Sequence, residues 1–220
     1  MKRAVAAEAL GALLLLATIV GSGIMAKRLS PANPAVALLA NAVATGCMLY
    51  VLIVALEPIS GAHLNPVVTL IEAAQRRLPR DRVLGYLAAQ VIGAYAGVLV
   101  AHAMFGEPLF EVSHRVRDSG GEVVGEVVAT FGLVLTIATT RGRAVQPAAV
   151  ALYIVAAYWF TSSTSFANPA VASARAFTDT FAGVRPADLL HFIPAQLAGG
   201  AAAAWLISCV LPAPAPSGSA

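Results

Sequence analysis

Charged side chains are scarce in this chain, and their scarcity excludes a soluble globular fold. Of its 220 residues, 11% are charged and 59% are hydrophobic, and the mean hydropathy is +0.79. A soluble domain carries about 25% charged residues, because polar side chains must cover its surface. Too few polar residues are present here to coat a globule, so the composition predicts a membrane protein.

Cysteine is nearly absent, and so are the usual arrangements of catalytic residues. Cys47 and Cys209 both lie inside apolar runs, which favours small apolar fillers over a disulfide or a metal pair. No Ser–His, metal-ligand or paired-carboxylate arrangement converges at helical spacing. The sequence therefore predicts no metal site and no enzyme. The pI near 9.1 is attributed to membrane topology and lipid contact, and no nucleic-acid partner is expected.

Long apolar runs are abundant, and six of them approach the length of about 20 residues that a bilayer span needs. The six predicted spans are 4–26, 35–56, 83–103, 121–139, 144–160 and 189–210, of which the fifth is the shortest. Six spans put both termini on one side, and the arginine cluster at 76–82 makes that side cytoplasmic. Residues 1–210 are expected to form a single membrane domain, followed by a disordered tail at 211–220.

Two Asn-Pro pairs carry the strongest signal in the chain. Asn65-Pro66-Val67 and Asn168-Pro169-Ala170 each follow an apolar run and precede about ten residues with helical potential, too few to cross a bilayer. Because proline is favoured at the first position of a helix, each pair predicts the start of a half-helix. Two half-helices in corresponding halves of a membrane chain indicate a transport site.

The two halves of the chain, about 1–110 and 118–210, repeat the same features in the same order. Glu8 in the first span matches Glu126 in the fourth, and Gln90-x-x-Gly93 matches Gln196-x-x-Gly199. Three spans per half make the repeat inverted. The half-helices are therefore expected to meet N-terminus to N-terminus near the midplane, with Asn65 and Asn168 directing amide N–H groups into an aqueous path.

The segment from Ile59 to Thr69 resembles the major intrinsic protein superfamily, the aquaporins and aquaglyceroporins, apart from Val67 where alanine is usual. The resemblance implies an all-α fold of six membrane helices and two half-helices. It also implies passive flow of water or small neutral solutes without a cofactor, usually through a homotetramer with one pore per subunit in the cell membrane. The alternative is an ion-coupled secondary transporter with broken helices, which would need coupling groups at the midplane.

The resemblance also places a constriction beside the second Asn-Pro pair. Counting by the family's spacing gives Thr45, Ala156, Ser165 and Val171, or Ala157 if the fifth helix is shifted by one residue. The last position is usually arginine, so these residues predict a wide ring without arginine or an aromatic side chain. Pore width and lining groups decide what passes.

Four further residues are singled out as parts of the channel. Glu8 and Glu126 are expected to accept N–H bonds from the half-helix loops, with a proton relay as the alternative. His63 is expected to line the pore mouth, and a role as a pH sensor is the alternative. Arg175, one helical turn beyond Val171, is expected either over the outer mouth or paired with Asp179.

Residues 162–171 and 177–183 resemble a bacterial subgroup associated with arsenic-resistance genes, in which valine after Asn-Pro-Ala is typical. The resemblance implies passage of arsenite as neutral trihydroxyarsenic, and of methylated trivalent arsenicals. The wide ring independently favours solutes larger than water, such as glycerol and urea. The sequence does not choose among water, glycerol and arsenicals.

Overall fold

The structure of the protein is a computed structural model that describes residues 1–210, all of which are helix, turn or loop. The elements are α1 (Lys2–Leu29), α2 (Pro34–Ser60), α3 (Pro66–Ala74), α4 (Arg80–Phe105), α5 (Gly120–Thr140), α6 (Gln146–Phe160), α7 (Pro169–Arg175), the 3-10 turn η1 (Pro186–Asp188) and α8 (Leu189–Val210). The prediction of an all-α fold is confirmed. The predicted tail at 211–220 lies outside the described residues.

Five segments are long and apolar enough to cross a bilayer: α1, α2, α4, α5 and Pro186–Val210. The sixth, α6, has 15 residues and is the shortest, as the sequence indicated. At 1.5 Å per residue α6 is roughly 22 Å long, less than the hydrocarbon core of about 30 Å. It begins two residues later than expected, at Gln146, directly before Pro147, which is favoured in a first helical turn.

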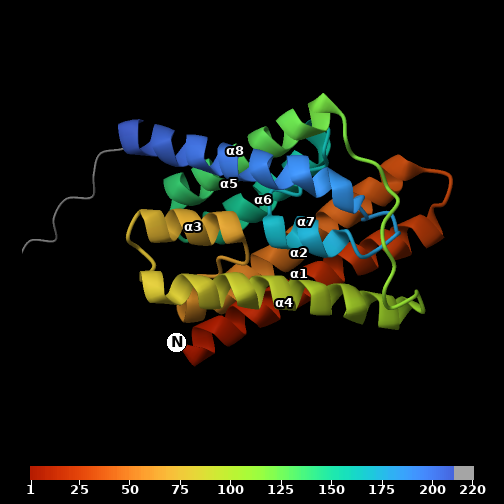
Figure 1. Cartoon of the computed structure of the whole chain (residues 1–220), viewed down its shortest axis with the longest axis horizontal. Coiled ribbons are helices and arrows are strands. Elements are labelled where there is room, and N and C mark those ends of the chain that lie inside the picture. The colour runs from red at the N-terminus through yellow and green to blue at the C-terminus, as the bar shows by residue number, and fades with distance from the viewer. Residues whose placement is uncertain (211–220) are drawn as a thin grey trace, which may run out of the picture.

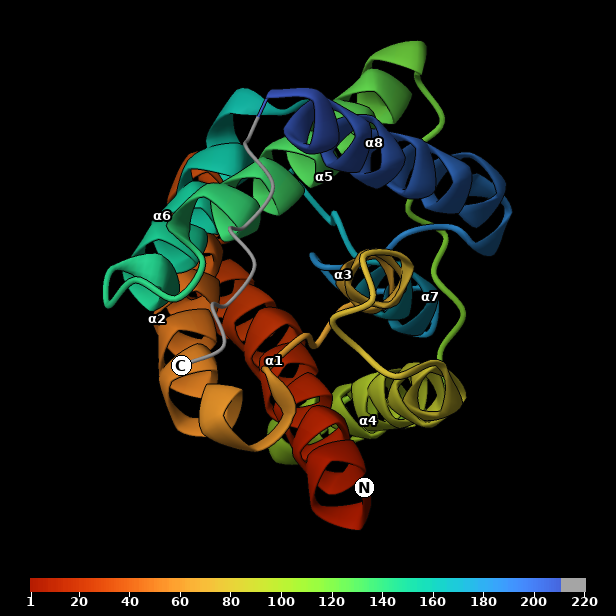
Figure 2. The ribbon, with the colours of Figure 1, turned by 90° about the vertical axis from the view of Figure 1, so that its left-hand side faces the viewer.

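The long helices form two matching halves. In the first half α1 packs against α2 and α4, and in the second α5 packs against α6 and α8. Contact between α2 and α6 joins the halves along one side. Seen end-on, the half-helices α3 and α7 lie between α4 and α8, with the other long helices on one side of them (Figure 2). The inverted repeat is therefore present in three dimensions as well as in the sequence.

The half-helices run from the middle of the molecule toward opposite ends (Figure 1). α3 has nine residues and α7 has seven, and each packs against both α4 and α8. Asn65 and Asn168 are their N-caps, and Pro66 and Pro169 are their first residues. A third Asn-Pro pair, Asn33-Pro34, caps and starts the full-length α2 instead, where Asn33 accepts from two backbone N–H groups.

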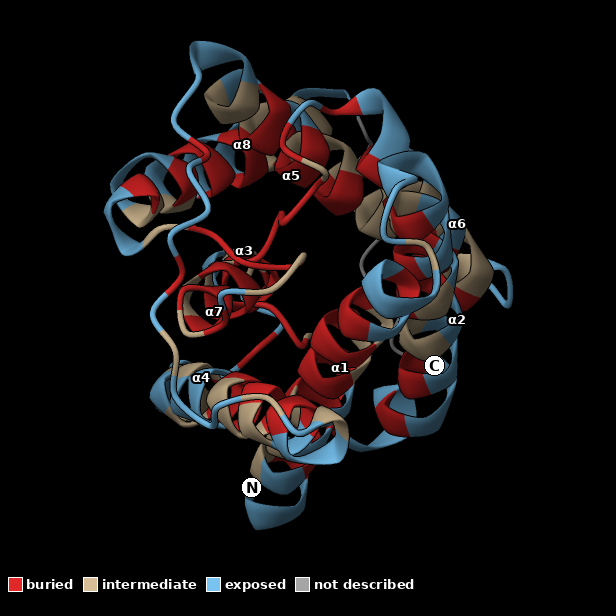
Figure 3. Ribbon diagram, turned by 90° about the vertical axis from the view of Figure 1, so that its right-hand side faces the viewer, coloured by how far each residue is buried: buried red, intermediate tan, exposed pale blue. Residues whose placement is uncertain are grey.

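Glycine lets the helices approach closely at matching places in the two halves. A Cβ at Gly93 in α4 would lie less than 3.0 Å from the backbone of Ala9 in α1, and one at Gly199 in α8 would meet Val127 in α5 in the same way. The buried residues face the interior of the bundle, and exposed residues cover its outer surface (Figure 3). Both cysteines are free, in agreement with the expectation that they form no disulfide, and both are exposed on their helices.

Candidate functional site

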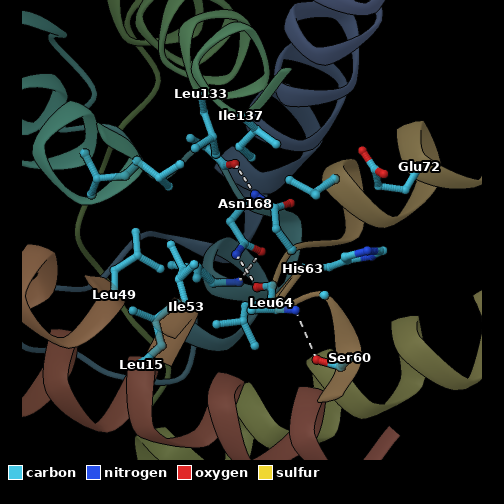
Figure 4. A pocket seen from close by; sticks show the side chains of 18 of the residues that line it. Leu15, Leu49, Ile53, Ser60, His63, Leu64, Glu72, Leu133, Ile137 and Asn168 are labelled. Carbon is cyan, nitrogen blue, oxygen red and sulfur yellow. Dashed lines mark hydrogen bonds between the residues drawn. The ribbon is translucent and has the colours of Figure 1, made fainter. Parts of the chain in front are cut away.

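A cavity of about 400 Å³ lies along the axis between the two halves. Its walls are largely aliphatic, with Leu49 and Ile53 from α2 facing Leu133 and Ile137 from α5 (Figure 4). Polar groups enter it at three levels: beside His63, at the two asparagines, and beside Arg175. We call its two limits the His63 end and the Arg175 end.

The two asparagines meet at the centre of the cavity through reciprocal hydrogen bonds. Asn65 Nδ2 donates to the carbonyl oxygen of Ala167 at 2.7 Å, and Asn168 Nδ2 donates to that of Leu64 at 2.8 Å (Figure 4). Each side-chain oxygen accepts from the first turn of its own half-helix, Val67 N at 2.9 Å and Ala170 N at 3.0 Å.

An amide NH₂ has two hydrogens, so each asparagine keeps one N–H for a molecule in the cavity. The N-termini of both half-helices, which carry partial positive charge, point at the same place. The centre of the cavity is therefore rich in donors and unfavourable to cations.

The loops before the asparagines have an unusual backbone conformation. Ala62 and Leu64 have φ of 46° and 51°, and Ser165 and Ala167 in the second half have 51° and 48°. A residue with a side chain adopts this left-handed region at a cost of about 1–3 kcal/mol and only where its surroundings enforce it. Gly61 and Thr164, which precede them, also have positive φ, of 85° and 61°, so the two loops have the same backbone shape. Ala62, Leu64, Ser165 and Ala167 all line the cavity.

Two fully buried carboxylates hold these loops. Glu8 accepts from the backbone N–H groups of His63 at 3.0 Å and Leu64 at 2.7 Å, and Glu126 accepts from those of Phe166 and Ala167, both at 2.9 Å. Each carboxylate also accepts from a buried glutamine, Gln90 for Glu8 at 2.7 Å and Gln196 for Glu126 at 2.6 Å.

Neither glutamate lines the cavity. Their positions therefore favour the role of loop support over that of a proton relay along the solute path.

Pro66, Val67, Pro169 and Ala170 do not line the cavity either. They form the first turns of the half-helices, and Val67 packs so closely on Gly200 in α8 that a Cβ there would collide with it. The cavity is lined instead by the asparagines that precede them and by Val68 and Val171. The Asn-Pro motifs therefore contribute their asparagines to the path and their other residues to helix packing.

The structure brings three of the four predicted constriction residues together. Thr45, Ser165 and Val171 all line the Arg175 end of the cavity, but Ala156 is exposed and does not line it. The residue of α6 that lines the cavity near Thr45 is Tyr158, whose hydroxyl lies 3.3 Å from Thr45 Oγ1. The prediction that Ala156 lies in the constriction is therefore wrong. The alternative, Ala157, is wrong too, because Ala157 is buried but does not line the cavity.

The physical reason is the helical period of 3.6 residues. Val150, Ile154 and Tyr158 recur every four residues and share the face of α6 that lines the cavity, whereas Ala156 lies on the opposite face. The expectation of a ring without an aromatic side chain is therefore corrected, because the wall includes the tyrosine.

Arg175 lines the cavity one helical turn beyond Val171, which agrees with the first of the two positions expected for it. Its side chain is buried, lines the cavity, and donates from Nε to the carbonyl oxygen of Ala182. Its guanidinium carbon lies 3.5 Å from the centre of the Phe166 ring. The alternative pairing with Asp179 does not occur, because Asp179 binds His114 through the backbone N at 2.8 Å and the ring at 3.0 Å.

A second buried arginine, Arg117, comes from the connection between α4 and α5. It donates to the carbonyl oxygens of Gly183 and Ser163, both at 3.1 Å, and lies 5.0 Å from the centre of the Phe166 ring. Burial, and to a lesser extent the charge of Arg115, lowers the pKa of Arg117 to about 10, so it is protonated at pH 7. Two guanidinium groups therefore lie on one phenylalanine beside the cavity.

At the other end of the cavity, His63 lines the wall and its Nδ1 lies 3.1 Å from Thr69 Oγ1. Beyond it, Glu72 of α3 binds two arginines that also line the cavity, Arg77 through two bonds of 2.7 and 2.9 Å and Arg141 of the second half. This ion cluster joins the end of α3 to the end of α5.

Sequence reasoning missed Tyr158, Arg117 and the Glu72 cluster. Tyr158 could have been found from the spacing of four residues that it shares with Ile154 and Val150. Glu72 is a carboxyl inside a membrane half-helix, a class of residue that is functional or paired by default. Nothing in the local sequence of Arg117 indicated that it is buried.

Comparisons with known proteins agree with this architecture. The family model described as major intrinsic protein matches residues 1–160. Aquaglyceroporin AqpS of Rhizobium meliloti (strain 1021) is 52% identical over 213 residues, covering 96% of this chain and 91% of the relative. Aquaporin PIP2-7 of Arabidopsis thaliana is 36% identical over 141 residues, covering 61% of this chain and 50% of the relative.

Among solved structures, the aquaglyceroporin from Plasmodium falciparum superposes with a TM-score of 0.71 over 96% of both chains at 16% sequence identity, which shows a shared fold. The family match covers well over half of the chain, and the first relative covers nearly all of it. The chain therefore belongs to the major intrinsic protein family and, like the members of that family, is a membrane channel and not an enzyme.

Proposed function

We propose that the channel passively conducts small neutral polar solutes: glycerol, urea, arsenite as neutral trihydroxyarsenic, methylated trivalent arsenicals, and water. The observation that carries the proposal is the pair of reciprocal bonds between Asn65, Asn168 and the opposite loops in the middle of the cavity. These bonds leave one N–H of each amide for a passing solute, and the converging half-helix ends oppose cations. Resemblance to proteins named aquaglyceroporins supports the class of solute.

The lining of the cavity supports solutes that carry both polar and apolar surfaces. Aliphatic side chains cover most of the wall, while hydrogen-bonding groups stand at its two ends and its centre. A hydroxylated solute can exchange one set of hydrogen bonds for the next without a long desolvated stretch, which keeps the free-energy barriers along the path low. A species with three hydroxyl groups fits such a path, and the resemblance of residues 162–171 to arsenic-associated channels adds arsenite to the set.

We further propose a homotetramer in the cell membrane, with one path per chain and both termini in the cytoplasm. The arginine cluster at 76–82 covers the connection from α3 to α4 and the first residues of α4, at the end of the molecule that holds the N-terminus (Figure 1). Basic loops favour the cytoplasmic side. Accessibility of residues near 76–82 and 143 to a membrane-impermeant label, and native mass spectrometry of the purified protein, test the two parts separately.

The test of the function is stopped-flow flux in proteoliposomes with a panel of water, glycerol, urea and arsenite. We expect each flux to rise linearly with concentration, to need no ion gradient, and to exceed that of empty liposomes. Saturating flux that depends on a proton or sodium gradient would instead indicate a coupled transporter.

The width of the Arg175 end can be tested at Thr45 and Val171, two small side chains that line the cavity there. Thr45→Phe and Val171→Arg are each expected to cut the flux of methylated arsenicals on the order of tenfold and to spare water more, because both fill space at the ring. Flux ratios of bulky solute to water, measured on equal amounts of inserted protein, provide the measurement.

Ala156→Phe is the matched control for Thr45→Phe. It adds the same kind of ring to α6, on the exposed face that the cavity does not touch. We expect it to leave both fluxes unchanged. A block by Ala156→Phe together with normal flux through Thr45→Phe would move the constriction to the opposite face of α6 and contradict the assignment of Tyr158.

A further inference from the structure

Five basic side chains lie close together where α1 begins and where α3 connects to α4, at the end of the molecule that holds the N-terminus (Figure 1). A buried cluster of Ala4, Leu78 and Tyr86 packs the start of α1 against this connection and the start of α4. The five side chains, which we call the basic face, are Lys2, Arg3, Arg76, Arg80 and Arg82.

The basic face is not neutralised by the part of the chain that the structure describes. Its five side chains form no hydrogen bond or ion pair there, and all are exposed except Arg82, which is half-buried. Asp81, the one acidic residue among positions 76–82, forms no ion pair with them either. Residues 211–220 contain no acidic side chain. A partner of the basic face therefore has to come from outside the chain.

Basic residues at the opposite end of the molecule are matched by acidic ones. Arg28 at the end of α1 pairs with Glu107 at 2.7 Å. Arg185, before η1, pairs with Asp118 at 3.1 Å and with Asp188 at 2.6 Å. The contrast between the two ends shows that the unpaired charge is a property of the basic face and not of every arginine at the surface.

The stability of the chain itself does not explain these charges. Lys2 and Arg3 lie in the first turn of α1, and Arg80 and Arg82 in that of α4, where the helix dipole favours acidic side chains. Arg76 follows the end of α3 with φ of 59°, in a position that glycine fills most easily. Positive side chains at unfavourable positions indicate that they serve a contact with another molecule.

An exposed apolar stripe continues from the basic face along α4. Leu84 follows Arg80 by four residues and Ile92 follows Leu84 by eight, so the three share one face of the helix. Leu84 is 79% exposed and Ile92 is 67% exposed. In a membrane channel such a stripe faces the hydrocarbon of the bilayer. Arg80 therefore lies where hydrocarbon gives way to headgroups, the place where arginine keeps its charged end in water.

We propose that the basic face is a binding surface for the headgroups of anionic phospholipids. Arginine donates to phosphate oxygens through two N–H groups at once, and a group of four to eight basic residues beside a membrane helix is typical of anionic-lipid binding. The apolar stripe favours a lipid over a soluble phosphate, because it accommodates acyl chains directly below the headgroup. The inference goes beyond the proposed function and does not depend on which solute the channel conducts.

A lipid bound to this surface would join two parts of the first half of the channel. Its phosphate would contact Lys2 and Arg3 of α1 together with Arg76 and Arg80, which flank the connection that follows α3. The half-helix α3 begins after Asn65, so the lipid would stabilise the segment that holds this asparagine in the cavity. Anionic lipid should therefore raise the thermal midpoint of the folded channel.

The test adds dioleoyl phosphatidylglycerol or dioleoyl phosphatidylcholine to the purified full chain in detergent. Native mass spectrometry measures lipid affinity, and a melting curve gives the thermal midpoint. We expect the anionic lipid to bind more tightly and, near saturation, to raise the midpoint by about 5 °C more than the zwitterionic lipid does. Arg76→Gln/Arg80→Gln should lower the affinity for phosphatidylglycerol about tenfold or more and remove most of the added rise.

Lys2→Gln/Arg3→Gln tests the other side of the basic face and should act in the same direction. It decides the question if Arg76→Gln/Arg80→Gln does not fold. The matched control is Lys27→Gln/Arg143→Gln, which removes the same number of positive charges outside the basic face, at the end of α1 and in the connection from α5 to α6. It should keep both the affinity and the rise.

Two results would overturn the inference. In the first, the variants of the basic face and the control keep the same preference for phosphatidylglycerol as the unmodified protein. In the second, inorganic phosphate added with phosphatidylcholine raises the midpoint as much as phosphatidylglycerol does, which would make the occupant a soluble anion. Neither readout involves solute flux, so failure of the proposed function in proteoliposomes is distinguishable from failure of this inference.

Discussion

Replacing Glu126 by alanine is expected to remove most of the folded channel from the membrane. The carboxylate is fully buried and accepts from Phe166 N, Ala167 N and Gln196 Nε2. Alanine leaves three buried donors without an acceptor, at roughly 1–3 kcal/mol each. It also releases a loop whose left-handed residues need support. Total stabilities are only about 5–15 kcal/mol, so a loss of this size is a large fraction of the whole.

The measurement is the amount of monodisperse protein after detergent extraction, together with the thermal midpoint of the fraction that survives. Glu111→Ala is the control, because Glu111 is half-buried and makes no hydrogen bond or ion pair within residues 1–210. It should leave both values near those of the unmodified protein. Normal yield of Glu126→Ala with a changed proton leak would support the proton relay and refute the structural role.

The features that could be predicted from the sequence are those that depend on local patterns. The Asn-Pro pairs predicted half-helices because proline fixes the first helical position, and the structure starts α3 and α7 at Pro66 and Pro169. The apolar runs predicted the spans because a bilayer demands length and hydrophobicity. The repeated glutamates could be linked to the loops because an inverted repeat assigns one carboxyl to each.

The features that could not be predicted depend on how distant segments meet. Successive side chains of a helix point about 100° apart, so a count along α6 that is off by one or two residues selects a side chain on another face. The count reached Ala156 in this way, whereas the cavity is lined by Tyr158. The position of the Arg175 side chain depends on segments before and after α7, since Phe166 stacks on it and Ala182 O accepts from it. Asp179 binds His114 instead of Arg175. A spacing of four residues suggests an ion pair between Arg175 and Asp179, but it does not show that a distant residue such as His114 binds Asp179 instead.

The second large effect is expected at the contact between α1 and α4. Gly93→Val should lower the thermal midpoint by about 10 °C or more, or prevent folding. A Cβ at Gly93 would lie less than 3.0 Å from the carbonyl oxygen of Ala9, which belongs to the helix backbone and cannot rotate away. The two helices must therefore separate. Overpacking costs about 1–3 kcal/mol where side chains yield, and more where backbone must move. Each kcal/mol shifts the midpoint of a protein of this size by about 2–4 °C.

The same substitution at Gly120 separates this packing effect from the general cost of valine in a helix. Gly120 starts α5, and a Cβ there would have no neighbour within 4 Å. Gly120→Val should therefore change the midpoint little. Gly199→Val, which meets the backbone of Val127 in the other half, should behave like Gly93→Val because the inverted repeat places both glycines in equivalent contacts. Equal thermal midpoints for Gly93→Val and Gly120→Val would show that the close approach of α1 and α4 does not require glycine at position 93.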